Sequence, residues 1–91
     1  MGPEQQILVK LQTNYLGKIY MREFSKKETD PDAPSQLEMI AGIMSQRDFK
    51  ERLSVYREIK LRYDRAISSD SKNLTKCMKR MMDHYHAHVL D

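Results

Sequence analysis

The sequence has one cysteine, Cys77, no tryptophan, and only three glycines and three prolines among its 91 residues. A single cysteine cannot form an internal disulfide, which favours a reducing compartment. The chain has no run of about 18 apolar residues that could span a membrane. Its first residues also lack a basic stretch followed by an apolar core, which is the pattern of a signal peptide. We therefore expect an intracellular protein, cytoplasmic or nuclear, that is not secreted and does not bind membranes.

Features of catalytic sites are also scarce. The glycines stand apart at positions 2, 17 and 42, so the sequence has no glycine-rich phosphate loop. The acidic residues are scattered or interleaved with basic ones. Cys77 falls on the apolar side of the last predicted helix, which suits a small core residue better than a nucleophile. We expect no enzymatic activity, no cofactor and no small-molecule substrate.

The composition describes one small domain, residues 1–91, with 40% apolar and 32% charged residues. This length is near the lower limit for a self-sufficient core, and such chains commonly gain stability by pairing with another protein or a second copy. The net charge of +3 is too small to indicate nucleic acid by itself.

The N-terminal segment favours a helix at about 4–24, with Pro3 at its first turn. Its predicted apolar face is formed by Leu8, Leu11, Tyr15 and Ile19. The alternation of Ile7, Val9 and Leu11 leaves a β-hairpin at 6–24 as the alternative. A polar stretch with two prolines, residues 25–34, predicts a flexible linker.

The middle of the chain predicts two helices. Ser35 and Glu38 form a capping-box pattern that opens a helix at about 35–44. A second apolar stripe follows, made of Phe49, Leu53, Tyr56, Ile59, Tyr63 and Ile67. On one continuous helix the two stripes would lie roughly 160–180° apart, so they could not face one core. This predicts a break near Ser45, where Ser45 and Asp48 form another capping pattern, and a second helix at about 46–67. A continuous helix between two partners is the alternative.

The C-terminal segment predicts the most amphipathic helix, at about 72–89. Its apolar face holds Leu74, Cys77, Met78, Met81, Tyr85 and His88. Lys72, Lys76, Lys79, Arg80 and Asp83 form the opposite face. Together the segments predict an all-α protein, a small bundle of three to four helices.

Amphipathic helices rich in methionine and tyrosine are typical of surfaces that bind other proteins. The leading hypothesis is therefore a non-enzymatic protein–protein interaction module, such as an adaptor, assembly factor, chaperone or regulator. It would bind a partner or a second copy of itself. The predicted anchors are Tyr56, Tyr63, Met78, Met81 and Tyr85.

The alternative is a nucleic-acid-binding regulator. Residues 35–57 resemble a helix-turn-helix unit, in which Arg47 and Lys50 would open the second helix, although Ser45 replaces the usual turn glycine. Lys76, Lys79 and Arg80 are poorly neutralised within their own helix and could add phosphate contacts.

The histidines suggest a metal site, because His84 and His88 are four residues apart on a helix. Two ligands are too few for a site, and His86 points away from the pair. We therefore expect no metal, with His88 on the packed face and His84 and His86 in solvent.

Overall fold

The computed structural model describes residues 2–91, and all its regular elements are helical. They are α1 (Pro3–Thr29), α2 (Leu37–Ser45), α3 (Phe49–Ser68) and α4 (Lys72–Tyr85), followed by a π-helical turn, η1 (His86–Leu90). The predicted all-α bundle is confirmed. The β-hairpin alternative for residues 6–24 is wrong, because Leu16, Tyr20 and Phe24 recur every four residues and a helix places all three toward the core.

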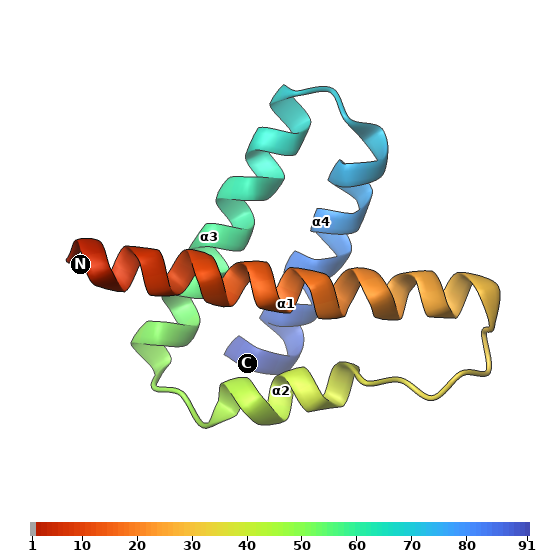
Figure 1. Ribbon diagram of the computed structural model, residues 1–91, viewed down its shortest axis with the longest axis horizontal. Helices are drawn as coiled ribbons and strands as arrows, with labels where there is room; N and C mark the ends of the chain where they lie inside the picture. Colours follow the sequence, from red (N-terminus) through yellow and green to blue (C-terminus); the bar gives the residue numbers. More distant parts are fainter. Residues whose placement is uncertain (1) are drawn as a thin grey trace.

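The helices form layers across a body of 41 × 33 × 20 Å. α3 and α4 lie side by side as an antiparallel hairpin, and α1 crosses in front of it (Figure 1). α2 runs along the lower edge and packs against α1 and η1. α1 is thus the outer layer on one side of the molecule. Within residues 2–91, every helix is too short or too polar to cross a membrane.

The face of α1 that packs on the core is not the predicted one. Its buried side chains are Thr13, Leu16, Tyr20, Glu23 and Phe24. The predicted packing residues Leu8, Leu11 and Tyr15 are 63%, 58% and 58% exposed. α1 carries two apolar stripes, and the stripe that continues toward its C-terminal end is the one covered by the other helices.

α1 also extends further than predicted, so residues 25–29 of the predicted linker are helical. The helix ends at Thr29 because the residue before a proline is pushed out of the helical region. That residue is Asp30, which precedes Pro31 and has φ −143° and ψ 90°. The following loop is tied back to α1. Glu23 accepts a hydrogen bond from the Gln36 N–H at 3.0 Å, and Lys27 donates to the Ala33 carbonyl at 2.9 Å.

The predicted break near Ser45 is confirmed, but its details differ. α2 ends at Ser45 and α3 begins at Phe49, three residues later than predicted. Asp48 is the N-cap, and its carboxylate accepts a hydrogen bond from the Glu51 N–H at 2.8 Å. The predicted Ser35 capping box does not form, because Ser35 Oγ accepts from the Leu37 N–H and Gln36 stands at the N-cap.

The core is built where α1 and α2 meet the α3–α4 hairpin. It contains Leu16, Tyr20, Phe24, Ile40, Met44, Val55, Ile59, Met78, Met81, Tyr85 and Val89. Three side chains that the sequence placed on packed faces, Phe49, Ile67 and Leu74, are instead 53%, 50% and 44% exposed. They lie near the ends of α3 and α4.

Candidate interaction surface

Three of the five predicted anchors lie inside this chain's own core. Met78, Met81 and Tyr85 are 6%, 1% and 0% exposed. The Tyr85 hydroxyl donates to the carbonyl of Arg52 at 2.8 Å, and burial raises the pKa of this phenol well above its usual range. Tyr56 stacks on Tyr85 with ring centroids 6.3 Å apart. The α4 face that was assigned to a partner is therefore covered by α3 of the same molecule.

Tyr56 and Tyr63, the other two predicted anchors, are half-buried. Both belong to the margin of the core rather than to an open surface. The five predicted anchors therefore do not form one accessible surface.

The histidines occupy different places from those expected. His84 is half-buried, and its Nδ1 lies 2.7 Å from the Tyr20 hydroxyl, whereas His88 is exposed. Burial, with a smaller contribution from His88, lowers the pKa of His84. His84 and His88 lie close together, with ring centroids 4.4 Å apart. Among residues 2–91, however, no three histidine, cysteine or acidic side chains gather closely enough to hold a metal ion.

The residues considered for nucleic acid are spread over the molecule, and three of the five have intramolecular contacts. Arg47 pairs with Glu51 at 3.6 Å, and Lys79 pairs with Asp83 at 3.0 Å. The Arg80 guanidinium lies over the Phe24 ring, 3.9 Å from its centroid. Lys50 and Lys76 are exposed. The two helices of the helix-turn-helix-like unit, α2 and α3, have other main neighbours, since α2 packs on α1 and η1.

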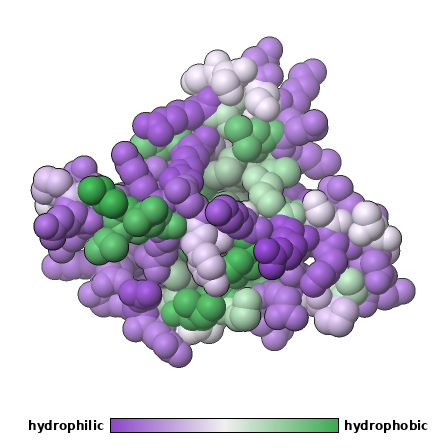
Figure 2. All heavy atoms as spheres, in the orientation of Figure 1, coloured by the Kyte–Doolittle hydropathy of each residue, from purple (hydrophilic) through white to green (hydrophobic). Residues whose placement is uncertain are grey.

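An apolar surface lies instead on the N-terminal half of α1. Figure 2 shows hydrophobic atoms gathered there, on the face turned away from the hairpin. We call this surface the α1 outer face. Its residues are Ile7, Leu8, Leu11 and Tyr15, which are 58%, 63%, 58% and 58% exposed. At roughly 170 Å² per large apolar side chain, these exposures leave about 400 Å² in contact with water.

The periodicity of Leu8, Leu11 and Tyr15 is visible in the sequence, but the prediction that these side chains face the core is wrong. The signal that could have reversed the assignment is the competing row Leu16, Tyr20 and Phe24. That row gains weight only when the helix is extended beyond residue 24, because Phe24 then lies within the helix instead of at its end.

Arg62 holds this part of α1 against α3. Its guanidinium donates to Asn14 Oδ1 at 2.6 Å and to the Lys10 carbonyl at 3.3 Å. Its Nε also donates to Glu58 Oε1 at 3.2 Å, which orients the side chain. The α1 outer face is therefore presented on a helix that is fixed to the body of the protein.

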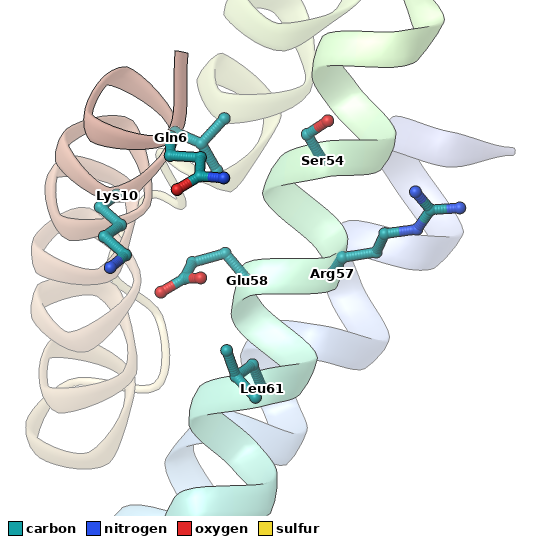
Figure 3. Close-up of a pocket in the computed structure, with 7 residues that line it drawn as sticks. Gln6, Lys10, Ser54, Arg57, Glu58 and Leu61 are labelled. Carbon is teal, nitrogen blue, oxygen red and sulfur yellow. The ribbon is translucent and has the colours of Figure 1, made fainter. Parts of the chain in front are cut away.

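A shallow groove of about 320 Å³ lies between α1 and α3, near the hydrogen bonds of Arg62. Figure 3 shows Glu58 and Gln6 reaching toward the space between the helices, while Arg57 extends away from α1. Mixed polar and apolar side chains line the groove. The groove extends the edge of the apolar surface but offers no enclosed site.

A scan of protein-family models, a search of curated proteins and a search of solved structures each found no match.

Proposed function

We propose that this protein is a non-enzymatic protein–protein interaction module that docks through the α1 outer face. The observation that carries the proposal is the clustering of four large apolar side chains, each more than half exposed, on one face of one helix. An apolar patch of about this size is near the largest that a typical monomer exposes, and such patches often mark binding sites.

The setting of the patch supports a binding role. Two hydrogen bonds from Arg62 tie α1 to α3 at Lys10 and Asn14. A helix that is already ordered loses little conformational entropy when a partner docks. The mode of recognition would be helix against helix, with anchors spaced by one turn.

Photo-crosslinking tests the proposal. A photoreactive phenylalanine analogue in place of Leu8 or Tyr15 should form covalent adducts with a protein, either another protein or a second copy. Leu11→Glu in the same chain should abolish the adducts, because a charge replaces an apolar anchor. The matched control is Leu74→Glu, which makes the same change at another exposed leucine, on α4, and should leave them intact.

Absence of adducts from both positions would contradict the proposal. So would adducts that survive Leu11→Glu, because the contact would not then depend on the α1 outer face.

Nucleic-acid binding is the second candidate, and one observation favours it. Lys50, Arg57, Lys60 and Arg65 are exposed along α3, and no acidic side chain among residues 2–91 lies within 4.0 Å of their charged groups. If these cations bind phosphates, affinity for labelled duplex DNA or RNA should fall steeply with salt. The double variant Lys50→Ala/Arg57→Ala should then reduce both the affinity and its salt dependence. Equal binding by variant and wild type would refute this candidate.

A further inference from the structure

We propose that the partner of the α1 outer face is a second copy of this chain, with the two α1 helices packed antiparallel about a twofold axis. This inference rests on the proposed function, because it names the occupant of that surface.

The exposed positions along α1 have the spacing of a helix that pairs with another helix. Residues 4, 8, 11, 15, 18 and 22 alternate in steps of four and three, and all six are exposed. This is the repeat with which two helices pack side by side, each side chain fitting between those of the other helix. The stripe spans about 27 Å at 1.5 Å per residue. It begins with Glu4, continues through Leu8, Leu11 and Tyr15, and ends with Lys18 and Arg22.

The charges of this stripe are complementary to those of an identical stripe that runs in the opposite direction. When the helices run antiparallel with their crossing point level with Thr13, Leu11 faces Tyr15 of the partner subunit. Glu4 then faces Arg22 of the partner subunit. The apolar stem of Lys18 covers Leu8 of the partner subunit. Twofold symmetry makes every one of these contacts twice.

The other arrangements are less complementary. A parallel pair would place Glu4 against itself, and likewise Lys18 and Arg22, so like charges would face each other. An antiparallel pair shifted by one heptad would place Glu4 against Tyr15 and leave both cations outside the contact. An acidic partner helix would suit Lys18 and Arg22 but would face repulsion from Glu4.

The stripe is accessible to a second copy, and its area suits an interface. α1 is the foremost layer on its side, so two copies can approach without their hairpins colliding (Figure 1). The apolar side chains supply about half of the roughly 800 Å² per partner that a standard interface buries. Glu4, Lys18 and Arg22 extend the contact along α1. Figure 2 also shows apolar atoms over α2 on this side, where Met39 and Ile43 are 45% and 37% exposed.

Sedimentation equilibrium of the full chain, from about 1 to 500 µM, tests the dimer. The wild type should approach twice its mass of 10.8 kDa as concentration rises. Leu11→Glu enters the symmetric interface twice and should raise the dissociation constant about 100-fold or more. Leu74→Glu, the matched control, should leave the constant unchanged. Circular dichroism should show the same helix content in all variants.

A charge swap identifies the second copy and the antiparallel register. Glu4→Lys alone and Arg22→Glu alone should each weaken the dimer about 5- to 10-fold, because like charges then meet twice. The double variant restores opposite charges and should return to within about 3-fold of the wild type. Both residues are exposed, so neither change affects the core.

Three results would overturn the inference: a monomer over the whole concentration range, a dimer insensitive to Leu11→Glu, or a double swap that fails to restore association. A monomer whose α1 outer face still crosslinks to other proteins would overturn the dimer and leave the proposed function standing. A monomer without any crosslink would overturn both.

Discussion

Replacing Tyr85 with phenylalanine removes one hydroxyl from the centre of the core and leaves the ring in place. The lost contact is the 2.8 Å hydrogen bond to the Arg52 carbonyl, which joins α4 to α3. A buried hydrogen bond of this kind stabilises a protein by about 1 kcal/mol net. In a domain of this size, about 1 kcal/mol corresponds to a fall in Tm of roughly 4–8 °C.

Replacing Tyr85 with alanine removes the ring as well. Truncating a buried aromatic side chain costs about 3–5 kcal/mol, because apolar contacts are lost and a cavity remains. The side chain is 0% exposed and also stacks on Tyr56, so the full cost should apply. At roughly 4–8 °C per kcal/mol, Tyr85→Ala should lower Tm by roughly 12–40 °C. This cost is a large part of the total stability of a 91-residue domain, which is about 5–14 kcal/mol.

Thermal melts followed by circular dichroism at low micromolar concentration measure both effects. Tyr15→Phe is the matched control, since Tyr15 is 58% exposed and its hydroxyl has no intramolecular partner among residues 2–91; its Tm should change little. If Tyr85→Ala melted within 2–3 °C (about 0.5 kcal/mol) of the wild type and lost self-association instead, the reasoning would be wrong. Tyr85 would then be an exposed partner anchor rather than part of this chain's core.

Three further changes test the local interactions of the fold. Asp48→Ala removes the N-cap of α3 and should lower the free energy of unfolding by about 1 kcal/mol. Asp48→Ser keeps a capping oxygen, so it should retain most of that stabilisation in the same thermal melt. The pKa of His84 is lowered below its ordinary 6.5, so the unfolded chain binds the proton more readily than the folded one. The stability should therefore fall as pH drops below 6.5. In melts between pH 8 and 5, His84→Gln should reduce this dependence of Tm on pH. The hydrogen bond from the Gln36 N–H is the main cause that holds the pKa of Glu23 below 4.5. The ionised Glu23 carboxylate should therefore stabilise the fold at neutral pH. This contribution should be lost only in more acidic solution, as pH falls through the lowered pKa. Glu23→Ala should also make residues 30–36 more sensitive to limited proteolysis, because the loop loses its tie to α1.

The fold class and the break between α2 and α3 could be predicted because both are encoded locally. Opposed apolar stripes on either side of Ser45 exclude one straight helix, and Asp48 can cap a new helix without help from distant residues. The spacing of Met81 and Tyr85 also predicts that both lie on the apolar face of their helix, and both side chains are buried. Periodicity alone does not say whether the helix that covers this face belongs to the same chain.

The site depends on contacts that a sequence pattern cannot supply. The Tyr20 hydroxyl meets His84 across 64 residues, and Arg62 meets Asn14 across 48. These contacts decide which face of α1 turns inward, and no local rule ranks the two apolar stripes. Thr13 and Glu23 obscure the buried row in the sequence, because polar residues are typical of a solvated face. Thr13 is buried with its hydroxyl bonded to the Val9 carbonyl at 2.7 Å, so it carries no unpaired polar group.

The two faces of α1 differ in burial for a physical reason. The inner row contains Tyr20 and Phe24, whose rings find specific neighbours in His84 and Arg80 on α4. An aromatic row with such partners positions α1 uniquely, since a rotation of the helix would lose both contacts at once. Leu8 and Leu11 lack such partners, and turning them inward would not replace the lost contacts. The outer stripe is thus left exposed by the packing that specifies the fold. In the proposed dimer, a second α1 would bring the same stripe in the opposite direction and would cover it without any change in the monomer.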